Sequence, residues 1–143
     1  MELDVQLTED NVPVVFHERT LNRTTNGSGE VKSIDSNSLS SLDAGCWFDT
    51  RYEGEAVPLL VDALNLCKEL NLGANLEIKT YDNSIHNTVL HTLLVVNEFG
   101  RDFDEKLLFS SFNTEVLSTL KNISPNSPRG LLVDNFQGDL AAD

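Results

Sequence analysis

The sequence predicts an α/β fold built on a mainly parallel sheet. From residue 58 onward, segments with helical periodicity alternate with short apolar segments, and residues 2–7 alternate with a period of two. The expected strands are 2–7, 12–16, 75–79, 107–112 and 129–134, and the expected helices are 58–70, 84–99 and 114–122. Parallel strands need right-handed crossovers, so the pattern fits either a barrel or an open doubly wound sheet. No GxGxxG or Walker segment follows any strand, which counts against a nucleotide-binding fold.

Each element has a local justification. The segment ELDVQL alternates strictly from Glu2, and Asp10-Asn11 marks a turn before the second extended run. Pro58 suits a first helical position, and Gly73 is expected to stop that helix. Its apolar stripe consists of Leu59, Leu60, Ala63, Leu64, Cys67 and Leu70. Gly100 is expected to end the second helix.

Residues 19–56 differ in composition from the rest of the chain, because they are rich in Ser, Thr, Asn, Gly and Asp. Long excursions of this kind in compact domains are usually functional or poorly ordered. The segment nevertheless contains apolar anchors, namely Leu39, Leu42, Trp47, Phe48 and Tyr52. We therefore expect a folded flap.

Composition narrows the possible functions. The 143 residues are enough for one modest domain, and the formal net charge is -13. Nucleic acid is not an expected partner, because a basic surface is missing, whereas a bound cation would still permit an anionic small substrate. No apolar run reaches the roughly 18 residues of a membrane span. Cys46 and Cys67 are expected to be free thiols, and we expect a cytoplasmic location.

Polar side chains on two strands are the candidate site. Residues two apart on a strand share a face, so Glu2 and Asp4 point the same way, as do Glu77 and Lys79. Carboxylates from different strands can bind Mg²⁺ or Ca²⁺, and a lysine beside them can hold a phosphate oxygen. His17 ends the second extended run and could transfer a proton. The competing interpretation is that these are solvated faces and surface ion pairs, and spacing alone leaves both open.

The order of several motifs resembles the glycerophosphodiester phosphodiesterase family. The first block is ELDVQLTEDNVPVVFH at residues 2–17, followed by TLNRTTNG at 20–27. Supporting stretches are LDAGCWF at 42–48, GEAVP at 54–58, LEIK at 76–79 and SF at 111–112. The resemblance covers nearly the whole chain in the family's order. It implies a (β/α)8 barrel of the phospholipase C-like type, with its site at the carboxyl ends of the strands.

The resemblance also implies an activity and a set of site residues. It implies hydrolysis of glycerophosphodiesters to glycerol 3-phosphate and an alcohol, assisted by a divalent metal, Mg²⁺ or Ca²⁺. By position, Glu2, Asp4 and Glu77 would be metal ligands, His17 would be one of two acid/base histidines, and Lys79 would be catalytic and close to the phosphate. Residues 19–56 correspond to the family insertion over the active-site mouth. Trp47 and Phe112 would contact substrate, although a purely structural role for Trp47 is an equal alternative.

Two departures from the family pattern matter. The His-Arg-Gly segment that carries the other histidine normally precedes the Glu-x-Asp strand, and here Met1 stands directly before Glu2. The family usually has His-Asp where this chain has His17-Glu18. We therefore expect residues 1–143 to be a central fragment of the barrel, aggregation-prone and of little activity when alone. The alternatives are a non-catalytic relic that binds metal and phosphate, and an unrelated α/β protein. The oligomeric state is open.

Overall fold

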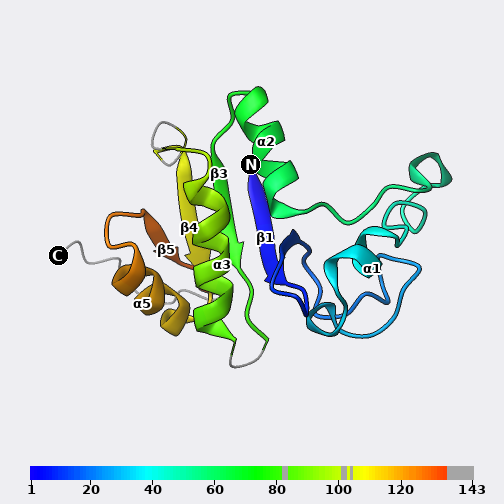
Figure 1. Ribbon diagram of the computed structural model, residues 1–143, viewed down its shortest axis with the longest axis horizontal. Helices are drawn as coiled ribbons and strands as arrows, with labels where there is room; N and C mark the ends of the chain where they lie inside the picture. The colour runs from blue at the N-terminus through cyan, green and yellow to red at the C-terminus, as the bar shows by residue number, and fades with distance from the viewer. Residues whose placement is uncertain (82–83, 101–102, 104, 135–143) are drawn as a thin grey trace.

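The computed structural model describes residues 1–81, 84–100, 103 and 105–134. Its centre is a five-stranded sheet in the order β2-β1-β3-β4-β5 (Figure 1). The strands are β1 (Glu2–Leu7), β2 (Pro13–Val15), β3 (Ala74–Ile78), β4 (Leu107–Ser111) and β5 (Arg129–Leu131). Strands β1, β3, β4 and β5 are parallel neighbours, and β2 joins the edge of β1 in the antiparallel sense. Each parallel strand lies beside the next one along the chain, which is the order of a barrel rather than of a doubly wound sheet.

Helices α2 (Leu60–Glu69), α3 (Ile85–Asn97) and α5 (Thr114–Ile123) lie between successive parallel strands. The expected order of strands and helices is therefore confirmed. Helix α2 starts two residues later than expected, because Pro58 lies before its N-cap, Leu59. Gly73 does not stop this helix; Asn71 has the left-handed backbone, with φ 55°. Gly73 is instead required by packing, since a Cβ there would lie 2.7 Å from the carbonyl oxygen of Lys106.

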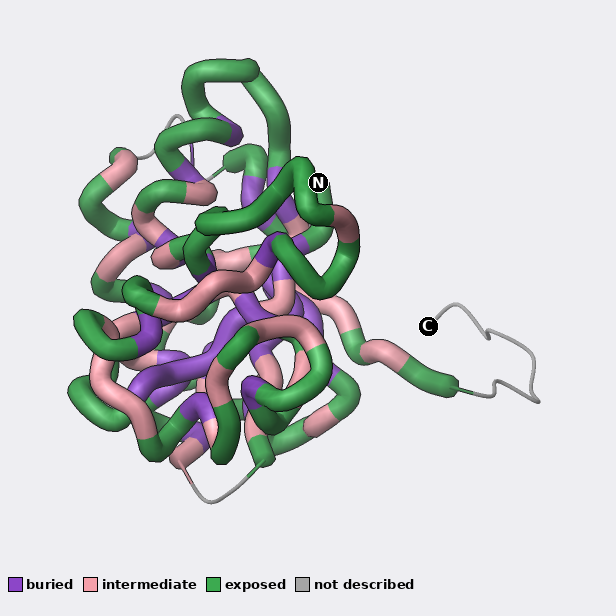
Figure 2. Tube along the Cα trace, turned by 90° about the vertical axis from the view of Figure 1, so that its right-hand side faces the viewer, coloured by how far each residue is buried: buried purple, intermediate pink, exposed green. Residues whose placement is uncertain are grey.

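The main apolar core contains buried residues of the sheet and of α2, α3 and α5. Buried residues gather in the interior of the molecule (Figure 2). Alternate residues of β1, β3 and β4 enter this core, including Leu3, Val5, Leu76, Ile78, Leu107 and Phe109. Because neighbouring strand residues alternate between faces, Glu2, Asp4 and Glu77 lie on the opposite face of the sheet. The period-two pattern thus separates the core from the candidate site.

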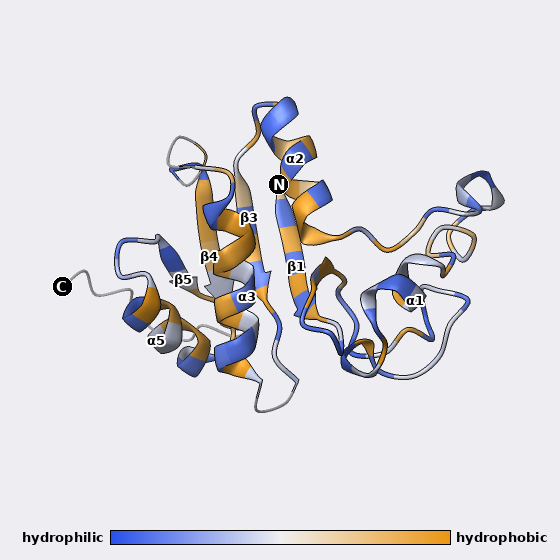
Figure 3. Ribbon diagram, in the orientation of Figure 1, coloured by the Kyte–Doolittle hydropathy of each residue, from blue (hydrophilic) through white to orange (hydrophobic). Residues whose placement is uncertain are grey.

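Residues 19–56 form a folded flap, as expected, and extend from the β1 side of the sheet (Figure 1). Short helices lie within it: η1 (Val31–Ser33), α1 (Ser36–Ser40) and η2 (Thr50–Tyr52). A second apolar core, separate from the main one, joins the flap to β2 and consists of Val14, Phe16, Leu21, Val31, Leu39 and Val57. The rest of the flap is largely hydrophilic (Figure 3). Across the described residues, none of the helices combines the length and apolarity needed to cross a bilayer.

Candidate metal and phosphate site

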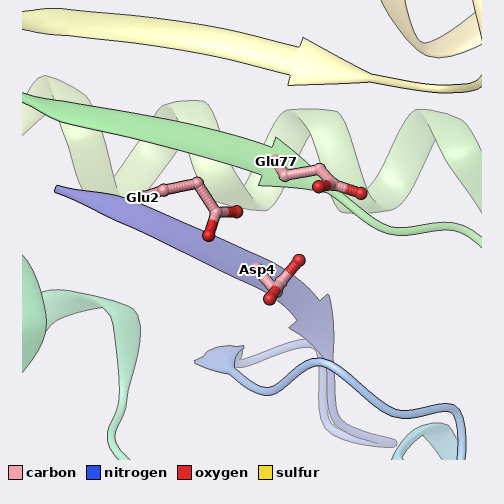
Figure 4. A group of neighbouring side chains, drawn as sticks. All are labelled: Glu2, Asp4 and Glu77. Atoms are coloured by element: carbon pink, nitrogen blue, oxygen red, sulfur yellow. The ribbon is translucent and has the colours of Figure 1, made fainter. Parts of the chain in front are cut away.

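Three carboxylates from two adjacent strands converge on the face away from the helices (Figure 4). Glu2 and Asp4 come from β1, and Glu77 comes from β3, where it lies directly beside Asp4 in the parallel register. One ligand oxygen from each residue lies within 4.8 Å of the others. The alternation of β1 and the register of β1 with β3 therefore create the cluster.

Lys79 lies among these carboxylates. It follows Glu77 by two residues, so the two side chains share a face. Its Nζ is 2.5 Å from Glu77 Oε1 and 3.1 Å from Asp4 Oδ1, and all three side chains are mostly buried. Burial alone would lower the pKa of Lys79, but hydrogen bonds and charges from Glu77 and Asp4 outweigh it and raise this pKa. The lysine is thus held protonated.

The remaining charge of the cluster favours a bound cation. Partial burial raises the pKa of Glu2, and the negative charges of Asp4 and Glu77 raise it further. An oxygen-only donor set is what hard divalent cations such as Mg²⁺ and Ca²⁺ prefer. Among the described buried side-chain atoms, Asn75 Oδ1 and Ser110 Oγ have no hydrogen-bond partner, and they flank Glu2 and Glu77 in register on this face. The residues therefore fit a divalent cation.

His17 lies beside β1 but outside the group of three carboxylates. The backbone N–H of Phe16 donates to the carbonyl oxygen of Asp4 at 2.9 Å, which sets the position of the next residue. The His17 side chain is 61% exposed, and its charge acts to lower the pKa of Glu2. The three carboxylates thus meet as expected, and His17 flanks them.

Two residues that sequence reasoning missed hold the His17 backbone. Buried Gln6 donates through Nε2 to the carbonyl oxygens of Phe16 at 2.6 Å and Glu18 at 2.8 Å. The Tyr81 hydroxyl donates to the carbonyl oxygen of His17 at 2.8 Å, and burial raises the pKa of Tyr81. Both residues continue the alternation of the site strands by two positions, which is the signal that could have identified them.

The side chain of Glu18 links His17 to the flap. Its Oε1 is 3.3 Å from His17 Nδ1 and accepts hydrogen bonds from Arg23 Nε at 2.9 Å and Nη2 at 2.5 Å. The hydrogen bond from Arg23 lowers the pKa of Glu18, so the carboxylate is ionised. The Arg23 guanidinium in turn lies 5.4 Å from the centre of the Trp47 ring.

The two aromatic candidates occupy different places. Phe112 follows β4 directly, and its ring centre is 5.9 Å from Lys79 Nζ, so it borders the carboxylate cluster. Trp47 lies in the flap, half-exposed, in edge contact with Phe48. The contact of Trp47 with the site runs through Arg23 and Glu18.

A cavity of about 180 Å³ adjoins the cluster through Lys79. Its walls are the carboxyl end of β1, the residues around the start of α3, and the first part of the flap. Arg19, Glu30 and Lys32 from the flap line the same cavity as Lys79 and Tyr81. None of the three carboxylates lines the cavity, so the cluster and the cavity are neighbours that share one lysine.

Known proteins resemble this chain over nearly its whole length. A family model described as the glycerophosphoryl diester phosphodiesterase family matches residues 1–142. A glycerophosphodiester phosphodiesterase from Caldanaerobacter subterraneus subsp. tengcongensis is 36% identical over 132 residues, which are 92% of this chain and 54% of the relative. Glycerophosphodiester phosphodiesterase 1 of Mus musculus is 33% identical over 123 residues, covering 85% of this chain and 36% of the relative.

Solved structures agree in fold. A phosphodiesterase from Oleispira antarctica, solved with the product sn-glycerol-3-phosphate, matches with a TM-score of 0.86 and 35% identity over 91% of this chain and 52% of its own. A glycerophosphodiester phosphodiesterase from Agrobacterium tumefaciens matches with a TM-score of 0.79 and 34% identity over 90% and 52%. The chain spans about half the length of these relatives, so its sheet is an incomplete (β/α)8 barrel. The chain belongs to the glycerophosphoryl diester phosphodiesterase family.

Proposed function

We propose that a complete barrel containing this chain hydrolyses glycerophosphodiesters to glycerol 3-phosphate and an alcohol, with a divalent cation held by Glu2, Asp4 and Glu77. The observation that carries the proposal is the convergence of these three carboxylates with Lys79 on one sheet face. Membership of the family and the product bound to the Oleispira antarctica relative support the reaction class.

In this proposal, the charge and position of each side chain determine its role in the reaction. The bound cation would supply positive charge to the phosphodiester oxygens. Lys79, kept protonated by Glu77 and Asp4, adds a second positive charge for a phosphate oxygen. His17, exposed and fixed by its backbone, gives a proton to the departing alkoxide or takes one from the attacking group. The net charge of -13 is no barrier, because Lys79 and a bound divalent cation would together offset the charge of the three carboxylates at the site.

The flap covers the active-site mouth in this proposal. Residues of the flap line the same cavity as Lys79 and Tyr81, at the carboxyl end of β1, which supports that placement. Phe112, beside Lys79, forms one apolar wall for the substrate. Trp47 contributes a second aromatic surface to the mouth, and its half-exposed ring is suited to this.

The test is turnover in a completed barrel. A chimera joins this chain to the parts of the Caldanaerobacter relative that lie outside the match, and glycerophosphocholine hydrolysis is measured with Mg²⁺ or Ca²⁺. Glu77→Gln should lower turnover by on the order of a hundredfold or more, since ligand removal costs at least as much as loss of a supporting contact. Glu69→Gln, at an exposed position at the end of α2, is the matched control and should leave turnover unchanged.

Equal turnover in the Glu77→Gln and Glu69→Gln chimeras would remove the carboxylate cluster from the reaction. A folded chimera that binds metal and does not hydrolyse the diester would favour the non-catalytic alternative. Circular dichroism shows whether each chimera is folded, so that a folding failure is not read as a loss of chemistry.

A further inference from the structure

We propose that Arg23, supported by Trp47 of the flap, is a positioning residue that orients the His17 imidazole through Glu18. The inference rests on the proposed function for its catalytic meaning, but the contacts that carry it are independent of the metal ligands. It gives the flap a role in the acid/base chemistry beyond covering the mouth.

The backbone of His17 is already fixed, so only its side-chain torsions remain free. Three consecutive carbonyl oxygens, those of Phe16, His17 and Glu18, each accept a side-chain hydrogen bond. Gln6 belongs to β1 and Tyr81 follows the end of β3, so both donors come from the chain segments that carry the carboxylate cluster. What remains to be set is the direction of the imidazole ring and the nitrogen that carries its proton.

Glu18 sets both. An ionised carboxylate only accepts hydrogen bonds, so the contact of 3.3 Å between Glu18 Oε1 and His17 Nδ1 requires the proton to be on Nδ1. The other ring nitrogen, Nε2, is then the one that can accept a proton from a reacting group. An orienting carboxylate on one nitrogen of a reactive histidine is a recurring arrangement in catalytic sites.

Arg23 fixes the same oxygen atom that His17 contacts. Its Nε and Nη2 both donate to Glu18 Oε1, at 2.9 Å and 2.5 Å, so this oxygen cannot rotate away without breaking two charge-assisted bonds. Because the Glu18 side chain is long and flexible, its carboxylate needs a restraint to stay in one position. Arg23 provides that restraint.

Trp47 contacts the Arg23 guanidinium. The guanidinium carbon lies 5.4 Å from the Trp47 ring centre, within the range of a cation–π contact. Trp47 donates through Nε1 to the carbonyl oxygen of Ala44 at 2.9 Å, which orients its ring within the flap. The Asp43 carboxylate accepts from the backbone N–H groups of Gly45, Cys46 and Gly54 and closes the loop that carries Trp47. The chain of contacts thus runs from the flap to the imidazole.

Arg51 provides a matched control for Arg23. It lies in the same flap, pairs with a carboxylate, Asp49, through Nε and Nη2, both at 3.1 Å, and sits 5.8 Å from the Tyr52 ring centre. Its environment therefore repeats that of Arg23, but among the described residues Arg51 forms no hydrogen bond or ion pair with His17 or Glu18. Arg23→Met and Arg51→Met remove the same chemistry at two places, and only the first should affect His17.

The primary readout is the neutral tautomer of His17, observed by ¹⁵N NMR of the 143-residue chain well above the histidine pKa range. The wild type and Arg51→Met should show the proton mainly on Nδ1. Arg23→Met and Glu18→Gln should shift the population toward the Nε2–H form, and Arg23→Lys should fall between, because it keeps the charge and loses the two-nitrogen contact. His86 and His91 serve as internal references.

The second readout is kinetic and uses the completed barrel. Arg23→Met and Glu18→Gln should lower kcat about tenfold with KM unchanged, the scale found for residues that orient a functional histidine. An identical His17 tautomer in Arg23→Met and Arg51→Met would overturn the proposal, as would an altered tautomer with normal kcat. If the wild-type chimera lacks activity, the proposed function fails, and the tautomer comparison still decides whether Arg23 orients His17.

Discussion

The sheet and the flap are held together by different means. In the sheet, side chains alternate between a helix-covered apolar core and a polar face, so a single rule places Phe109 inside and Glu77 at the site. In the flap, a smaller core is supplemented by carboxylates that accept from backbone N–H groups, such as Asp43 and Asp35. The comparison teaches that the convergence of the three carboxylates depends on periodic structure, whereas the contact of the His17 side chain with the flap, through Glu18 and Arg23, depends on irregular structure.

The largest effect should come from the sheet core. Phe109 in β4 is 2% exposed and contributes to the core under the three helices. Phe109→Ala should lower the free energy of unfolding by about 3–5 kcal/mol, because both buried area and packing are lost. Urea denaturation of the chain measures it. A loss below about 1 kcal/mol would show that this core does not hold the structure together.

The flap core should give a smaller and local effect. Leu39 in α1 is fully buried in the second core, which joins the flap to β2. Leu39→Ala should lower the free energy of unfolding by about 2–3 kcal/mol. This is at the low end for such a change, because the flap can relax around the space that the side chain leaves. Hydrogen exchange should show lost protection in residues 19–56 with β3 and β4 unaffected. Equal loss in both regions would mean that flap and sheet unfold as one unit.

A substitution at Gly45 tests the packing of the flap loop that carries Trp47. A Cβ at this position would lie 1.9 Å from the carbonyl oxygen of Tyr52, so the backbone must shift. Gly45→Ala should cost about 1–3 kcal/mol, the usual range for overpacking. Gly130→Ala is the matched control, because a Cβ there meets nothing within 4 Å. Thermal unfolding compares the two, and equal melting temperatures would contradict the close approach.

The smallest effect concerns pH and the site itself. Since the pKa of Glu2 is raised on folding, chiefly by burial and then by Asp4 and Glu77, the folded chain binds this proton more tightly than the unfolded chain. Stability without metal should therefore fall as the pH rises from the usual carboxyl range through this raised pKa. Glu2→Gln should remove this pH-dependent loss of stability. The free energy of unfolding of the variant, relative to that of the wild type, should therefore be higher at pH 8 than at pH 4. Unfolding measurements in the presence of EDTA at both pH values give this difference in stability. The same difference at pH 4 and pH 8 would contradict the raised pKa of Glu2.

Periodicity explains which parts of the molecule were predictable. The strands, the helices and the convergence of Glu2, Asp4 and Glu77 follow from alternation and from parallel pairing. The roles of Arg23 and Trp47 were not predictable, because their contacts cross an irregular segment whose path depends on tertiary hydrogen bonds. The end of α2 was also not predictable from the sequence. Gly73 was expected to stop this helix, but the left-handed backbone conformation occurs at Asn71.

The most direct measurement of the central claim is a Mn²⁺ titration of the 143-residue chain, followed by paramagnetic broadening of its backbone amide NMR signals. Mn²⁺ takes the oxygen ligands that Mg²⁺ takes. Broadening should centre on the amides of Glu2, Asp4 and Glu77 and should disappear in Glu77→Gln. Broadening centred on the exposed acids Glu53 and Glu55 of the flap, with sharp signals from β1 and β3, would contradict the claim that these two strands form a metal site.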